Sequence, residues 1–128
     1  MSVALGHMAI DLMASVAPIL VAFLSVPLGL SNAQVGLAAT LYTAMGSLSQ
    51  PFFGHFADRL GARPFALAGL LWMVIWLSAA SLAPGYGLLV ACLGLAGLGS
   101  GAYHPQGAMS AFLSSGPQRG GSLSVWSL

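Results

Sequence analysis

Two titratable side chains lie near the start of the chain at a spacing suited to shared chemistry. His7 and Asp11 are four residues apart, so a helix would present them on one face. Asp11 is the only carboxylate within an apolar run, where a central Asp costs about +2.5 to +3.5 kcal/mol. A group that is so costly normally faces the inside of a helix bundle or a wet cavity, together with a partner.

A third titratable side chain, His104, is predicted at a similar depth. It lies about 18 residues, or about 27 Å, along an apolar run that starts near Tyr86. Pro105 cannot donate to the carbonyl of Gly101, which frees an acceptor and favours a kink. We therefore expect His7, Asp11 and His104 to form one polar cluster. Two roles stay open for it: proton coupling, and a hydrogen-bond network that only joins two helices.

Composition determines the solvent that surrounds these groups. Hydrophobic residues make up 58% of the chain and charged residues 4%, against about 25% charged in soluble domains. Lipid is therefore the expected surroundings of the helices. The net charge of +1 gives no reason to expect a nucleic-acid partner. The single Cys92 gives no disulfide framework or metal cluster, and we expect no cofactor.

The apolar runs predict an all-α membrane protein with four transmembrane helices and the start of a fifth. A spanning helix needs about 20 apolar residues. The predicted spans cover residues 3–26, 33–56, 64–83 and 86–111, and a fifth starts at about residue 122. Because a partial span leaves backbone groups unsatisfied in lipid, we expect the chain to be an N-terminal fragment whose partners include missing C-terminal helices.

The arginines predict the orientation. Arg59 and Arg63 follow the second span, Arg119 follows the fourth, and the loops after the first and third spans are uncharged. Cytoplasmic loops carry an excess of Lys and Arg. The N-terminus is therefore expected in the cytoplasm, and the protein in the inner (plasma) membrane of the cell.

The loop after the second span carries a spaced motif of glycines and charges, Gly54, Asp58, Arg59, Gly61 and Arg63. Both arginines can compensate a carboxylate at a helix C-terminus. Gly54 would permit close helix approach, and Gly61 a sharp reversal of the chain. The simplest interpretation is a loop that only orients the helices. The full spacing, however, resembles the signature loop between helices two and three of the major facilitator superfamily. The resemblance implies a role in switching between outward-open and inward-open states.

Further segments resemble the fosmidomycin-resistance branch of that superfamily. They are Gly6–Asp11, Gln50–Gly54, Gly97–Pro105 and Ser115–Ser124. The resemblance covers essentially the whole chain. It implies a transporter that exports small drug-like molecules in exchange for protons by alternating access, with helices one and four lining the central cavity. Gln106 stands where the branch often has Glu, which removes one candidate proton carrier while leaving Gln106 beside the cavity.

Helix packing explains a pair of glycines in the fourth predicted span. Gly97 and Gly101 form a Gly-x-x-x-Gly pair, which is typical of close helix contacts in membranes.

Two other functions compete with transport. One is that of a short membrane protein that acts by associating with other helices. An intramembrane hydrolase built on Ser100, His104 and Asp11 is the other. Against the hydrolase, Ser100 and His104 lie on one helix and no nucleophile turn is evident, so we expect no enzyme.

Overall fold

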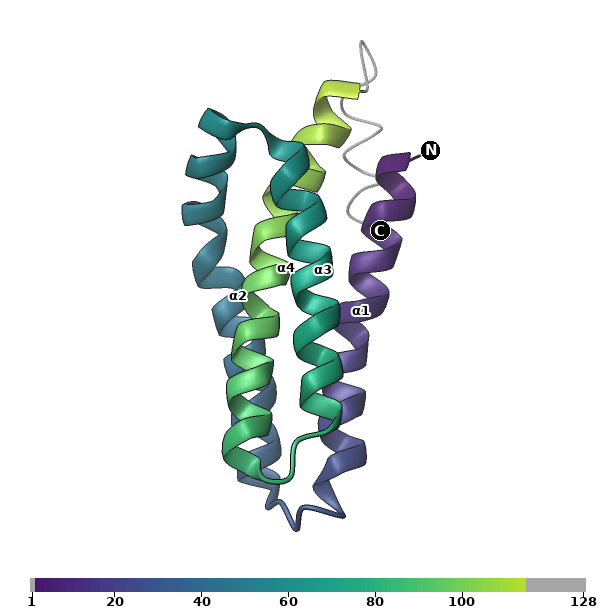
Figure 1. The fold of residues 1–128 in the computed structure, drawn as a ribbon, viewed down its shortest axis with the longest axis vertical. Helices are drawn as coiled ribbons and strands as arrows, with labels where there is room; N and C mark the ends of the chain where they lie inside the picture. Colours follow the sequence, from purple (N-terminus) through teal and green to yellow (C-terminus); the bar gives the residue numbers. More distant parts are fainter. Residues whose placement is uncertain (1, 115–128) are drawn as a thin grey trace.

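The computed structural model describes residues 2–114, and side chains for residues 8, 9 and 11–105. The four helices of this part are α1 (Ser2–Ser25), α2 (Asn32–Leu60), α3 (Ala62–Ser81) and α4 (Tyr86–Ser114). They run along the long axis of the molecule (Figure 1). The start of α1 and the α2–α3 link lie at one end, and the other two links lie at the opposite end. The predicted fifth helix and Arg119 lie outside the described residues.

Helix α4 is the central helix of this bundle. In its most apolar stretch, within Tyr86–Pro105, 61% of the residues are buried, against 22% in the corresponding stretch of α3. Its Leu89, Cys92 and Leu93 are among the most completely buried side chains of the structure. Figure 1 shows α4 running between α2 and α3, with α1 beside them. The helix that carries His104 is therefore held on two sides by neighbouring helices.

Glycines set the spacing between α4 and its two main neighbours. A Cβ placed on Gly97 or Gly101 would collide with backbone or side-chain atoms of α2, including the Tyr42 carbonyl oxygen and the Ser49 hydroxyl. A Cβ on Gly99 would lie 2.6 Å from the Gly69 carbonyl oxygen of α3. The backbones are thus in direct contact on both sides of α4, the arrangement that small residues allow in membrane bundles.

The α1–α2 end of the bundle is fixed by capping and by one long-range hydrogen bond. Ser31 and Gln34 form a capping box at the start of α2, in which each side chain accepts a hydrogen bond from the backbone of the other residue. The Tyr86 hydroxyl, at the start of α4, donates to the Gln34 carbonyl oxygen over 3.1 Å. The first turns of α2 and α4 are therefore joined directly.

The α2–α3 link is much shorter than the polar loop that the charge pattern indicates. Helix α2 continues to Leu60, so Asp58 and Arg59 lie in its last turn. Only Gly61 separates it from α3, with a φ of 95° and a ψ of 144°. Arg63 lies in the first turn of α3. The chain reverses at this one residue because glycine has no Cβ to prevent a positive φ.

Alanine at position 61 is therefore expected to destabilise the protein by about 1–3 kcal/mol, the usual cost of an outlying backbone conformation. Gly36→Ala is the matched control, because Gly36 lies within α2 and has open space around it. This control should gain up to about 1 kcal/mol from the better helix propensity of alanine. Thermal unfolding of both purified variants measures the difference, and equal stability would contradict the assigned backbone strain.

Two of the helices, as far as the structure describes them, are long and apolar enough to cross a membrane. They cover Ala62–Ser81 and Tyr86–Pro105, and Asp11–Ser25 is a shorter apolar stretch. Helix α2 does not meet the same criterion, and it carries Gln34, Thr43, Ser47 and Gln50 among its apolar residues. The predicted count of four spans therefore stays a prediction.

Candidate functional site: a polar cavity between three helices

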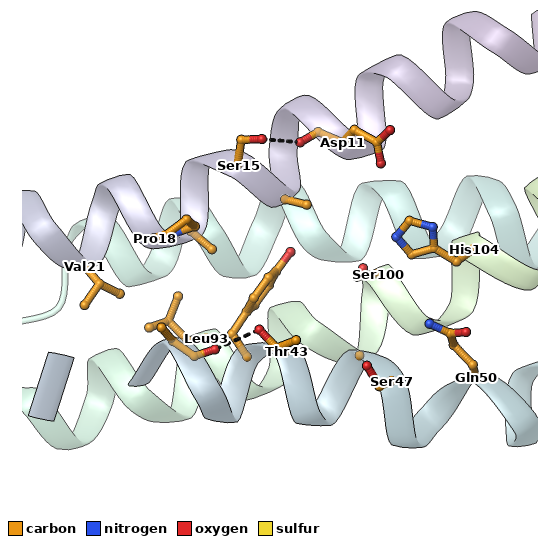
Figure 2. Close-up of a pocket in the computed structure, with 15 residues that line it drawn as sticks. Asp11, Ser15, Pro18, Val21, Thr43, Ser47, Gln50, Leu93, Ser100 and His104 are labelled. Carbon is orange, nitrogen blue, oxygen red and sulfur yellow. Dashed lines mark hydrogen bonds between the residues drawn. The ribbon is translucent and has the colours of Figure 1, made fainter. Parts of the chain in front are cut away.

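A cavity of about 480 Å³ lies between α1, α2 and α4. Its size is within the usual range for sites that bind small molecules. Figure 2 shows side chains from all three helices around it. Those that carry polar groups are Asp11, Ser15, Tyr42, Thr43, Ser47, Gln50, Ser100 and His104. An interior so rich in polar groups is unusual for a chain with this apolar composition, which makes the cavity the candidate site.

Asp11 and His104 both line this cavity, from α1 and α4 respectively. Figure 2 shows both side chains in the same half of the cavity. Their helices are separated by most of the length of the chain, so tertiary packing alone brings them together. The side chains of His7 and Gln106, the other two predicted members of the site, lie outside the described residues.

Helix α2 supplies three polar residues of the cavity, of which the sequence analysis names only Gln50. Thr43, Ser47 and Gln50 follow one another at intervals of four and three residues, and all three line the cavity. This spacing puts them on one face of a helix. The polar stripe is visible in the sequence, but it becomes a site only because α2 turns this face toward α1 and α4.

Hydroxyl groups line the middle of the cavity. The Tyr42 hydroxyl donates to the Met73 sulfur over 3.5 Å. Ser100 hydrogen-bonds the same tyrosine side chain from α4. Tyr42 and Ser100 are both buried, at 8% exposure each. Tyr42 thus connects the cavity to α3 on its far side, and helps to hold α2, α3 and α4 in register.

The charged motif lies apart from this cavity, at the α2–α3 link. Asp58, Arg59 and Arg63 are exposed, and none of them lines the cavity. The space beside Gly54 is open, since a Cβ there would meet no described atom within 4 Å. Gly54 therefore makes no close helix contact within the described part of the chain, although its lack of a side chain would permit one. Gly61 makes the reversal already described.

Pro105 and the glycine pair Gly97 and Gly101 all belong to α4, and the glycine pair sets how closely α2 approaches it. Helix α4 continues through Pro105 to Ser114. Gly97 and Gly101 contact α2, and this close approach carries the α2 face with Thr43 and Ser47 toward α4. Small residues on α4 thus determine how near the two polar walls come to each other.

The sequence of this chain matches the family model of the major facilitator superfamily over residues 3–128. The chain belongs to the major facilitator superfamily. It is also 30% identical over 121 residues to an uncharacterized MFS-type transporter, YfnC, of Bacillus subtilis strain 168. The alignment covers 94% of this chain but 29% of that relative. No solved structure gives a significant match.

Membership of the major facilitator superfamily makes this chain a membrane protein of a transporter family, whose members are generally not enzymes. Its helices form a bundle suited to a membrane. The resemblance to the fosmidomycin-resistance branch stays a prediction, because the comparisons identify the superfamily only.

Proposed function

We propose that this chain provides the first helices of a secondary active transporter, which exports small drug-like molecules in exchange for protons. The observation that carries the proposal is the cavity itself. In a member of a transporter family, it brings together the one carboxylate of the apolar runs, Asp11, and the imidazole of His104. An ionisable residue within a membrane helix typically marks a substrate or proton pathway.

Alternating access gives the rest of the fold a role. Transporter sites lie near the middle of the membrane, between groups of helices that rock against each other. The α2–α3 link carries Arg59 and Arg63, and cytoplasmic loops carry an excess of Lys and Arg. We therefore place this link and the N-terminus at the cytoplasmic side of the inner membrane. The start of α1 and this link are at one end of the bundle (Figure 1). Asp58, Arg59 and Arg63 are exposed at that end, where they would contact other helices of the transporter as it switches state.

Transport by the full-length gene product tests this proposal. The purified protein, reconstituted in liposomes, should accumulate a drug-like compound when the liposome interior is made acidic, and lose it when a protonophore collapses the gradient. Fosmidomycin belongs in the panel of compounds because of the branch resemblance. Accumulation that ignores the pH gradient would contradict proton coupling. Failure to move any compound would favour the alternative of a protein that acts through helix association.

A further inference from the structure

Three of the hydroxyl groups that line the cavity, those of Ser15, Tyr42 and Thr43, donate their hydrogens away from it. The Ser15 hydroxyl lies 2.8 Å from the Asp11 backbone oxygen, and the Thr43 hydroxyl lies 3.0 Å from the Ala39 backbone oxygen. Since a carbonyl cannot donate, each hydroxyl must donate its only hydrogen to its own helix. The Tyr42 hydroxyl likewise gives its hydrogen to a thioether sulfur. What Ser15 and Thr43 present to the cavity is therefore oxygen lone pairs, which accept hydrogen bonds, whereas the Tyr42 oxygen already bonds Ser100.

The charged groups of the described wall also favour a ligand that donates hydrogen bonds and carries a positive charge. Asp11 contributes a carboxylate, and no residue that lines the cavity is Lys or Arg. The chain contains no lysine, and Arg59 and Arg63 lie at the α2–α3 link instead. An anion such as a phosphonate is normally held by charged or fixed N–H donors. As donors this wall offers it one imidazole, one amide and one neutral hydroxyl, from His104, Gln50 and Ser47, and no permanently charged group.

The cavity also has two different ends. Figure 2 shows Asp11, His104 and Gln50 at one end, and Pro18, Val21 and Leu93 at the other. Val21 lies ten residues beyond Asp11, which corresponds to about 15 Å of helix. A ligand that fills this length needs a polar head at the Asp11 end and an apolar body beyond it.

We propose that this wall selects small amphipathic cations whose heads carry N–H donors, such as protonated amines, over phosphonates and other anions. The inference rests on the proposed function, because it names the substrate class of the same cavity. The ammonium head contacts the Asp11 carboxylate and the lone pairs of Ser15 and Thr43. The apolar body lies between Val21 and Leu93.

Binding of three probes that share one apolar body tests the proposal. The probes are phenylbutylamine, trimethyl(phenylbutyl)ammonium and phenylbutylphosphonate, titrated calorimetrically into the purified full-length protein in lipid nanodiscs. The amine should bind roughly tenfold or more tightly than the phosphonate, the ratio given by one charge-assisted hydrogen bond. The trimethyl compound should fall between them, because it has the charge but no N–H donor. A phosphonate that binds as tightly as the amine, or more tightly, would overturn the proposal.

Variants of the hydroxyl residues test the role of the lone pairs. Thr43→Val keeps the shape of the side chain and removes the acceptor, so the preference for the amine over its trimethyl analogue should shrink. Ser15→Ala provides a second variant with the same expected result if Thr43→Val unfolds. Ser25→Ala is the matched control, because Ser25 makes the same kind of bond to the Ala22 carbonyl oxygen, at 2.6 Å, without lining the cavity. An unchanged preference in both cavity variants would refute the assigned acceptors.

Binding and transport fail in distinguishable ways. If the amine binds most tightly but no probe is accumulated by liposomes, the proposed transport function is wrong and the substrate class of the cavity stands. If fosmidomycin or the phosphonate is accumulated and the amine neither binds nor competes, transport stands and the inferred class is wrong.

Discussion

Asp11→Asn in the full-length protein is expected to reduce accumulation driven by a pH gradient to the level of protein-free liposomes. Asparagine has the shape of aspartate but does not ionise, so the variant keeps the packing of α1 and loses the group that would carry the proton. Exchange of labelled for unlabelled substrate at equal pH requires no net proton movement, so it should persist at saturating substrate, with a higher half-saturating concentration because the Asp11 carboxylate also contacts the ammonium head. Both quantities are measured in the same liposome preparation.

Two outcomes separate proton coupling from a purely structural role of Asp11. If Asp11 only joins α1 to α4, the Asn variant will keep transport driven by the gradient and will unfold at a different temperature. Gradient-driven accumulation that survives the change would therefore contradict the coupling role. Ser25→Ala, on the same helix but outside the cavity, is the control for the effects of purification and reconstitution.

Gly97→Ala is expected to destabilise the folded protein by about 1–3 kcal/mol, the usual cost of overpacking a close contact. The added Cβ would collide with the Tyr42 carbonyl oxygen and would lie 3.2 Å from the backbone nitrogen of Gly46. These are backbone atoms, so no side-chain rotation relieves the collision and α2 itself must move. Thermal unfolding in detergent or nanodiscs measures the loss.

Gly94→Ala is the matched control for this prediction. Gly94 lies three residues away on the same helix, also facing α2, but its Cβ would be 3.6 Å from the nearest Leu41 side-chain atom. That is ordinary contact, so the control should be as stable as the wild type or up to about 1 kcal/mol more stable. If both variants unfold at the same temperature, backbone contact at Gly97 does not determine the spacing of α2 and α4.

The ends of the helices were predictable where local chemistry sets them. A serine just before an apolar run, followed three residues later by glutamine, is typical of a helix start, and Ser31 and Gln34 form a capping box there. The end of α2 was harder to predict, because a charged pair such as Asp58 and Arg59 indicates water but does not stop a helix. The helix ends instead at Gly61, where the backbone adopts a positive φ.

Some residues of the candidate site could also be predicted from the sequence, and others could not. Asp11 and His104 are recognisable in the sequence because an ionisable group is rare in an apolar run. Thr43 and Ser47 are not, because hydroxyl side chains are common in membrane helices and satisfy themselves on their own backbone, as Thr43 does. Their place in the cavity depends on the rotation of α2 about its axis. Gly97 and Gly101 set that rotation from another helix, and no local pattern in α2 encodes it.

The contact of backbone on backbone along α4 limits how this bundle can change shape. At Gly97 on one side and at Gly99 on the other, the nearest atom of the neighbouring helix is a backbone carbonyl oxygen, which cannot change rotamer as the helices tilt. We therefore expect helices α2, α3 and α4 to move together as one block. Helix α1 meets this block through side chains such as Ala17 and Val21. Any change in the volume of the cavity then comes from displacement of α1 against the block, and Asp11 moves with it.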